Sequence, residues 1–135
     1  LPIWSIPKSL GQCNSLLTVQ LNDNYFSGEI PEGLWSLQDM SVLKLSNNQL
    51  FGRLSNKLAQ KLTWIEISNN RFFGEIPSNA TFWDQLVTFE ASNNRISGSI
   101  PLELTSLSKL NSLSLDGNHL SGNVVAAKRI WNKKT

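Results

Sequence analysis

The chain has 135 residues, which is enough for one modest domain and too few for two large ones. Only 16% of the residues are charged, and this low content excludes a charge-rich disordered segment or a charged coiled coil. Four of the 12 basic residues lie within the last eight positions, so residues 1–127 hold 8 basic and 10 acidic side chains and offer no basic surface for nucleic acid.

The first 15 residues have the pattern of the later half of a structural repeat. Ile6-Pro7, Leu10 and Cys13 have spacings that recur further along the chain. We therefore predict a partial repeat over residues 1–15. Cys13 occupies a position that leucine takes elsewhere, so we expect a buried, unreactive thiol, and as the single cysteine it has no partner for an internal disulfide.

From residue 16 onward, one pattern recurs five times at intervals of 22 or 24 residues. In each copy apolar residues at alternate positions precede an asparagine, and a glycine follows that asparagine by four positions. The asparagines are Asn24, Asn48, Asn70, Asn94 and Asn118, and the glycines are Gly28, Gly52, Gly74, Gly98 and Gly122. The predicted units are 16–39, 40–61, 62–85, 86–109 and a partial unit, 110–123. This pattern is typical of leucine-rich repeats.

Each repeated position has a physical reason. The alternating apolar residues predict a short strand with one buried face, and identical units must stack their strands in parallel about 4.8 Å apart. The asparagine amide can turn inward to satisfy backbone groups, and the glycine suits a positive φ or a close backbone approach. The sequence therefore predicts an α/β repeat solenoid: a right-handed leucine-rich-repeat superhelix with a parallel sheet on its concave face and few helices.

The strand positions that face away from the core are the candidate binding surface. The candidates are Gln20, Val42, Lys44, Trp64, Glu66, Thr88 and Glu90. An exposed tryptophan beside carboxylates suits a peptide that carries an apolar group and a cationic side chain. The alternative is a solvated, mildly polar face on which Trp64 packs against Val42 and Thr88.

Asn79-Ala80-Thr81 is the only N-glycosylation sequence in the chain, and we expect a glycan on Asn79, on the convex side. The only histidine, His119, has no partner at a metal-ligand spacing, so we expect no metal site and no cofactor. No apolar run approaches the ~18 residues of a membrane span. Residues 124–135 are predicted to form a basic tail after the last repeat.

The spelling Asn-x-Leu-x-Gly-x-Ile-Pro resembles the plant-specific class of leucine-rich repeat, found in the ectodomains of plant receptor-like kinases. The segments Leu16–Ile30, Ile65–Ile76 and Leu104–Leu115 are similar to repeats of the HAESA-like and CLE-peptide-receptor branch. The resemblance implies a non-catalytic fragment of a receptor-like protein at the extracellular face of the plasma membrane. Its expected partners are a secreted peptide or protein ligand and a leucine-rich-repeat co-receptor.

Receptors of that branch hold the terminal carboxylate of their peptide with an Arg-x-Arg pair on the strands. The corresponding positions here read Thr18-Val19-Gln20, and no other strand offers such a pair. The sequence therefore does not support that mode of ligand binding for this chain.

The segment Val124–Asn132 resembles the third strand of a receptor-like kinase, and Lys128 falls on its ATP-contacting lysine. The other parts of a kinase have no room in the chain, so we expect no enzyme activity. Two further interpretations stay open: a truncated or mis-spliced piece of a receptor-like Ser/Thr kinase, and a structural or decoy solenoid that binds a co-receptor.

Overall fold

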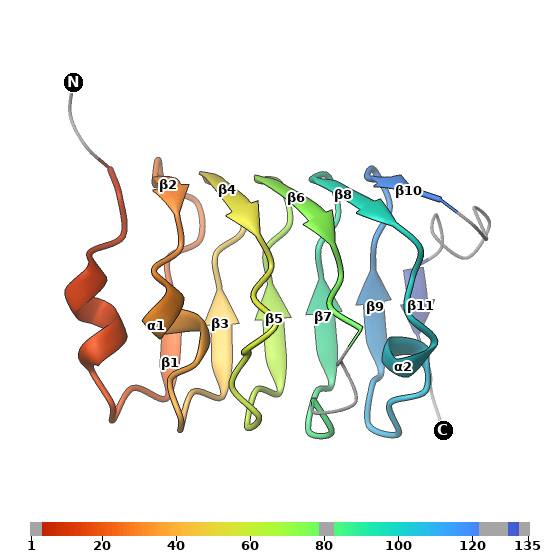
Figure 1. Ribbon diagram of the computed structural model, residues 1–135, viewed down its shortest axis with the longest axis horizontal. Coiled ribbons are helices and arrows are strands. Elements are labelled where there is room, and N and C mark those ends of the chain that lie inside the picture. Colours follow the sequence, from red (N-terminus) through yellow and green to blue (C-terminus); the bar gives the residue numbers. More distant parts are fainter. Residues whose placement is uncertain (1–3, 79–82, 122–129, 133–135) are drawn as a thin grey trace.

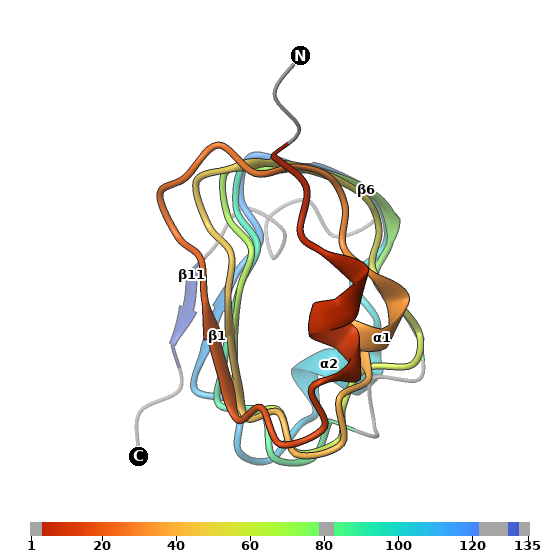
Figure 2. The ribbon, with the colours of Figure 1, turned by 90° about the vertical axis from the view of Figure 1, so that its left-hand side faces the viewer.

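The chain forms a solenoid whose turns each contribute one strand to each of two sheets (Figure 1). The structure, a computed structural model, describes residues 4–78, 83–121 and 130–132. Figure 2, an end-on view, shows the two sheets on opposite sides of the solenoid, with the short helices on the side of the second sheet. The predicted solenoid with few helices is confirmed.

The first sheet is the one that the alternating apolar residues predict. Its strands are β1 (Thr18–Gln20), β3 (Val42–Lys44), β5 (Trp64–Glu66), β7 (Thr88–Glu90), β9 (Ser112–Ser114) and β11 (Ile130–Asn132). The first five pair in parallel, with Leu43 opposite Ile65 and Ile65 opposite Phe89. The last strand, β11, pairs antiparallel with β9. The resemblance of Val124–Asn132 to a kinase strand implied an extended segment here, but the tail does not repeat the pattern of the preceding units, so the sequence did not predict that β11 would join the first sheet.

A second parallel sheet lies opposite the first one. Its strands are β2 (Ser27–Glu29), β4 (Gln49–Arg53), β6 (Arg71–Glu75), β8 (Arg95–Gly98) and β10 (His119–Leu120). Their residues alternate between the core and solvent: Leu50 is 0% exposed and the adjacent Phe51 is 43% exposed. The repeat pattern predicted only one sheet, because the glycine inside each of β2, β4, β6 and β8 signalled a turn rather than a strand.

The helices are short and begin after prolines. The α1 helix (Glu32–Trp35) follows Pro31, and α2 (Leu102–Thr105) follows Pro101. A 3₁₀ helix, η1 (Lys8–Gln12), packs on α1 so closely that a Cβ atom on Gly11 would lie 2.9 Å from the backbone nitrogen of Leu34. The partial repeat at the amino-terminal end is therefore stacked on the first complete turn.

The core is one continuous layer of leucine, isoleucine and aromatic side chains between the two sheets. Trp35 and Phe72 meet edge to face with ring centroids 6.3 Å apart, and Trp83 and Phe89 meet in the same way at 6.0 Å. Edge-to-face contacts of this kind stabilise a core by about 0.5–1.5 kcal/mol beyond the area that they bury. Different turns are therefore held together by aromatic contacts as well as by aliphatic packing.

The repeated asparagines connect successive turns through buried hydrogen bonds, as predicted. Asn70 Nδ2 donates to the carbonyl oxygens of Leu45 and Ile67 at 2.9 and 3.2 Å, and its Oδ1 accepts from the Leu50 amide at 3.0 Å. The corresponding bonds recur at Asn48, Asn94 and Asn118. Asn24, in the first complete unit, is exposed and donates only within its own turn.

A second, exposed ladder of side chains was not predicted. Asn47 donates to Asp23 at 2.7 Å, Asn69 to Asn47 at 2.7 Å, and Asn93 to Asn69 at 2.9 Å. These four residues have φ angles of 58–62°, a region that asparagine and aspartate tolerate better than other side chains. The two ladders explain why four of the five units carry two polar residues in succession at this point, whereas the fifth has Gly117, with a φ of 72°, before Asn118.

The predicted positive φ is confirmed at four of the repeated glycines, with values of +84° at Gly28, +112° at Gly52, +82° at Gly74 and +79° at Gly98. The fifth, Gly122, lies outside the described residues.

The prediction for Cys13 is wrong, because its side chain is exposed. Cys13 caps the end of η1, and its Sγ atom lies 3.7 Å from the carbonyl oxygen of Ser9. The partial repeat therefore places this position at the surface rather than in a leucine position of the core. Within the part of the chain that the structure describes, no helix is long and apolar enough to cross a membrane.

Candidate functional site

The candidate site is the outward surface of the first sheet, where strands β3, β5 and β7 lie side by side. Strand pairing places Lys44 opposite Glu66 and Glu66 opposite Glu90. The same pairing places Trp64 between Val42 and Thr88. The two rows of side chains that the sequence predicted are therefore adjacent on one surface.

Trp64, Glu66 and Lys44 form one interacting cluster. The indole Nε1 of Trp64 donates to Glu66 Oε2 at 2.9 Å, and Lys44 Nζ lies 3.6 Å from the same oxygen. The Lys44 ammonium also lies 4.9 Å from the centroid of the Trp64 ring. All three side chains are half-buried, so these contacts fix the indole plane while part of the ring stays open to solvent.

Glu90 stands next to this cluster without a cation of its own among the ion pairs of the described residues. Burial raises the pKa of the Glu90 carboxyl above its ordinary value of 4.5, the Glu66 carboxylate raises it further, and Lys44 lowers it in part. The neighbouring position on β9 is Ser114, which carries no charge. Any cation that approaches the ionised Glu90 carboxylate therefore stabilises it.

The raised pKa predicts a pH-dependent change in stability. The folded chain holds the Glu90 proton more tightly than the unfolded chain, so ionisation of Glu90 lowers the free energy of unfolding as the pH rises above 4.5. Glu90→Gln is expected to raise the free energy of unfolding at neutral pH and to have no effect below pH 4.5. Urea denaturation at a series of pH values measures this. Glu103→Gln, at an exposed position of α2, is the control, and an equal change in both variants would contradict the prediction.

The other predicted ligand-binding positions divide into two groups. Gln20 is exposed and Val42 is half-buried, so both remain on the accessible surface. Thr88 is only 4% exposed, and its assignment to the accessible surface is wrong. A short side chain paired with a tryptophan on the adjacent strand is shielded from solvent, and sequence position alone does not report the size of its neighbour.

Two predicted sites cannot be placed. The glycan acceptor Asn79 and the kinase-like Lys128 both lie outside the described residues. In the described ranges, no group of three or more His, Cys, Asp or Glu residues could hold a metal ion. The sequence predicted which residues share the site, but it did not predict the shared Glu66 oxygen that joins Trp64 and Lys44.

Comparison with protein families matches the Leucine Rich Repeat model at residues 15–37, 61–82 and 85–107, together half of the chain. The unmatched stretch between the first two matches, residues 38–60, covers nearly all of the unit that is two residues shorter than the other complete units. The matched residues cover strands of both sheets.

Several solved plant receptor structures are similar to this chain. One is the plant peptide hormone receptor RGFR1 in complex with RGF2, with 34% identity over 87% of this chain and 20% of that one, and a TM-score of 0.83. The Arabidopsis receptor kinase HAESA, in complex with the peptide hormone IDA and the co-receptor SERK1, gives 37% identity over 95% of this chain and 23% of that one, with a TM-score of 0.81.

A third similar structure is the BIR3–SERK2 complex from Arabidopsis thaliana, with 36% identity over 78% of this chain and 58% of that one, and a TM-score of 0.74. The chain thus spans about a fifth of the length of the RGFR1 and HAESA structures. The similarity extends over most of this chain and a small part of the larger solved structures.

Proposed function

This chain belongs to the leucine-rich repeat family, and on that basis we propose that it is a non-catalytic binding module from the extracellular part of a plant receptor. Its ligand is a secreted peptide or protein, held on the outward surface of the first sheet. The similar structures support this proposal, because those of RGFR1 and HAESA are complexes with RGF2 and IDA. The HAESA complex also contains SERK1, so a leucine-rich-repeat co-receptor is the second proposed partner.

The observation that carries the proposal is the uncompensated negative charge beside an accessible indole. Lys44 is already shared between Glu66 and the Trp64 ring, and Glu90 adds a further carboxylate. A ligand arginine or lysine placed between Glu66 and Glu90 would neutralise the excess charge. An adjacent apolar side chain of the ligand would cover the open part of the Trp64 ring.

The charge on this surface also determines which end of a peptide suits it. The two outward rows of the first sheet hold one cation, Lys44, in strands β1 to β9. A single lysine that is already paired is poorly suited to gripping a terminal carboxylate, which favours a bidentate arginine. We therefore propose recognition of a cationic side chain rather than of the carboxyl terminus of a peptide.

Binding of short synthetic peptides that place one arginine beside one leucine or phenylalanine tests this proposal. The matched probes replace arginine with citrulline, which keeps the shape of the side chain and removes its charge. We expect calorimetry to show binding of the arginine peptides only, and at least about tenfold weaker binding to Glu90→Gln. Binding should also weaken as the pH falls, because Glu90 then becomes protonated.

The exposed Glu103 on α2 supplies the matched control, since Glu103→Gln removes the same charge away from the first sheet. That variant is expected to bind the arginine peptides as the unaltered chain does. Equal affinity for arginine and citrulline peptides would contradict the proposal. So would equal losses of affinity in Glu90→Gln and Glu103→Gln.

A further inference from the structure

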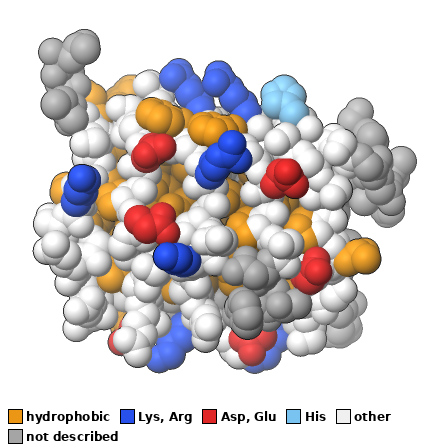
Figure 3. All heavy atoms as spheres, viewed as in Figure 1, with side chains coloured by type: hydrophobic (Ala, Val, Ile, Leu, Met, Phe, Trp, Pro, Cys, Tyr) orange, Lys and Arg blue, Asp and Glu red, His pale blue; other side chains and the backbone are white. Residues whose placement is uncertain are grey.

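The outward surface of the second sheet carries two exposed phenylalanines next to each other. Phe51 on β4 is 43% exposed and Phe73 on β6 is 38% exposed. Figure 3 shows two adjacent hydrophobic side chains on this surface, with basic groups along one side and groups of both signs along the other. We call this surface the outer face; it comprises Phe51 and Phe73 with the exposed charged residues Glu29, Arg53, Arg71, Glu75 and Arg95.

The charged residues of the outer face lie in register with the phenylalanines. Strand pairing places Phe73 between Arg53 and Arg95, and Phe51 between Glu29 and Arg71. Arg53 lies over the Phe73 ring, with Cζ 5.4 Å from its centroid. The ion pairs found among the described residues involve none of these charged groups, so each retains its capacity for a partner.

Glycines allow three of these charged side chains to lie flat on the sheet. A Cβ atom on Gly52 would lie 3.2 Å from Glu29 Cγ, and one on Gly98 would lie 2.7 Å from Glu75 Cγ. A Cβ atom on Gly74 would lie 2.7 Å from an Arg53 guanidinium nitrogen. Glu29, Arg53 and Glu75 occupy the same position in successive repeats and form one row along the stacked turns. The charges in this row are negative on β2, positive on β4 and negative on β6.

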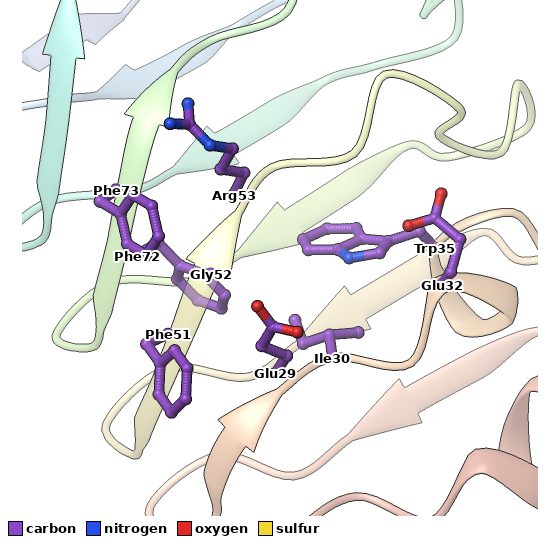
Figure 4. A pocket seen from close by; sticks show the side chains of 9 residues that line it. All are labelled: Glu29, Ile30, Glu32, Trp35, Phe51, Gly52, Arg53, Phe72 and Phe73. Carbon is purple, nitrogen blue, oxygen red and sulfur yellow. The ribbon is translucent and has the colours of Figure 1, made fainter.

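Arg53 lines two hollows beside this row. One hollow, of about 250 Å³, is lined by Trp35, Phe51, Phe72 and Glu29 among others, and Figure 4 shows the Glu29 carboxylate and the Trp35 ring pointing into it. The second, of about 440 Å³, includes Glu75 and Ser55 in its lining. The outer face thus presents a cation, two aromatic rings and acidic hollows within one small area.

We propose that the outer face binds a second copy of this chain. The two-fold axis lies along the outer face, perpendicular to the direction in which the turns stack, and passes midway between the turns that carry Phe51 and Phe73. That axis brings Phe51 of each copy onto Phe73 of the other, and Arg53 of each copy opposite Glu75 of the other. Each ion pair and each aromatic contact is therefore made twice, as in any interface formed by the same patch on both partners.

Self-complementarity is the reason for choosing a second copy as the occupant. Arg53 and Glu75 occupy equivalent positions in successive repeats. The two-fold axis therefore places the positive charge of each copy opposite the negative charge of the other. Paired residues in this sheet are displaced by two repeat positions from each strand to the next, so the strands are inclined to the axis and the strands of the two copies cross. An area of a few short strands is at the low end of interface sizes, so we expect a transient dimer.

The proposal is independent of the proposed ligand site. The outer face belongs to the second sheet and the Trp64 cluster to the first, on opposite sides of the core (Figure 2). A dimer would therefore leave the ligand surface open in both copies.

Sedimentation velocity over a wide range of protein concentration tests the proposal with the full chain. We expect the unaltered chain to show a monomer–dimer equilibrium. Arg53→Glu and Glu75→Arg are each expected to weaken it at least about tenfold, because each variant creates two like-charge contacts across the axis. Both variants use residue types that this row already carries at other repeats, so circular dichroism should show an unchanged fold.

Mixing the two variants gives the sharpest result. An Arg53→Glu copy and a Glu75→Arg copy form two opposite-charge contacts with each other, so the mixture is expected to recover the affinity that neither variant has alone. The double variant is expected to recover it as well. If the chain associated through the ends of the solenoid instead, neither single variant would weaken the dimer, and mixing them would give no gain in affinity. That result would contradict the proposal.

Arg71→Glu is the matched control, because Arg71 faces the neutral Gln49 of the second copy in this arrangement. It is expected to leave the equilibrium unchanged within about twofold. A chain that stays monomeric at every concentration overturns the proposal. So does a mixture that fails to associate, or a loss of dimer in Arg71→Glu that exceeds the loss in Arg53→Glu.

Discussion

Replacing Asn70 with alanine is expected to lower the free energy of unfolding by about 4 kcal/mol or more, the largest effect of any single polar substitution considered for this chain. The Asn70 side chain bonds the carbonyl oxygens of Leu45, Ile67 and Ser68 and the amide of Leu50. An unsatisfied buried backbone group costs about 1–3 kcal/mol, and alanine leaves several of them without a partner. Urea denaturation followed by circular dichroism measures the change.

Asn24→Ala is the matched control for this substitution. Asn24 occupies the same repeat position but is exposed, and it donates only to Leu21 and Asn22 within its own turn. Solvent can replace these partners, so we expect a loss below about 1 kcal/mol. Similar losses at the two positions would contradict the view that the buried ladder joins successive turns.

Phe72→Ala is expected to lower the free energy of unfolding by about 3–5 kcal/mol, as is usual for a buried phenylalanine. Phe72 is 1% exposed and meets Trp35 edge to face. The adjacent Phe73 is 38% exposed on the opposite face of the same strand, so Phe73→Ala is expected to cost less than about 1 kcal/mol. Thermal or urea denaturation of both variants provides the comparison. Equal losses of stability would contradict the alternation of buried and exposed side chains along β6.

The first sheet could be predicted from the sequence because its signal is local. Leu43, Ile65 and Phe89 recur at one repeat position, and in each of these units a charged residue and then a second apolar residue follow. That alternation defines a strand with one buried face, and repetition of the unit then requires parallel stacking. The inward asparagines followed from the same regularity, because one polar residue at the same position in five units needs a common set of partners.

The second sheet could not be predicted, because its glycines have two physical interpretations. Gly52 lies inside β4 with a φ of +112°, and a glycine at positive φ is more typical of a turn. Only the stacking of several turns shows that these segments pair with one another. The strand β11 lacks even a repeated pattern, and its antiparallel pairing with β9 depends on the geometry at the end of the sheet.

The sequence predicted the main residues of the candidate site, but its assignment of Thr88 to the accessible surface was wrong. Register alone places Lys44, Glu66 and Glu90 in one row, and the structure confirms this row. The burial of Thr88 and the shared oxygen of Glu66 depend on side-chain size and rotamer on neighbouring strands. Such properties arise from packing between turns, and they cannot be inferred from the order of residues within one turn.

The most direct test of ligand binding on the first sheet is the indole ¹⁵N–¹H resonance of Trp64, followed while an arginine-containing peptide is added. This N–H group donates to Glu66 within the proposed site, whereas Trp35 and Trp83 are buried in the core. We predict a saturable shift of the Trp64 resonance, unchanged Trp35 and Trp83 resonances, and no shift with the citrulline peptide. A peptide that binds without moving the Trp64 resonance would contradict the proposed location of the site.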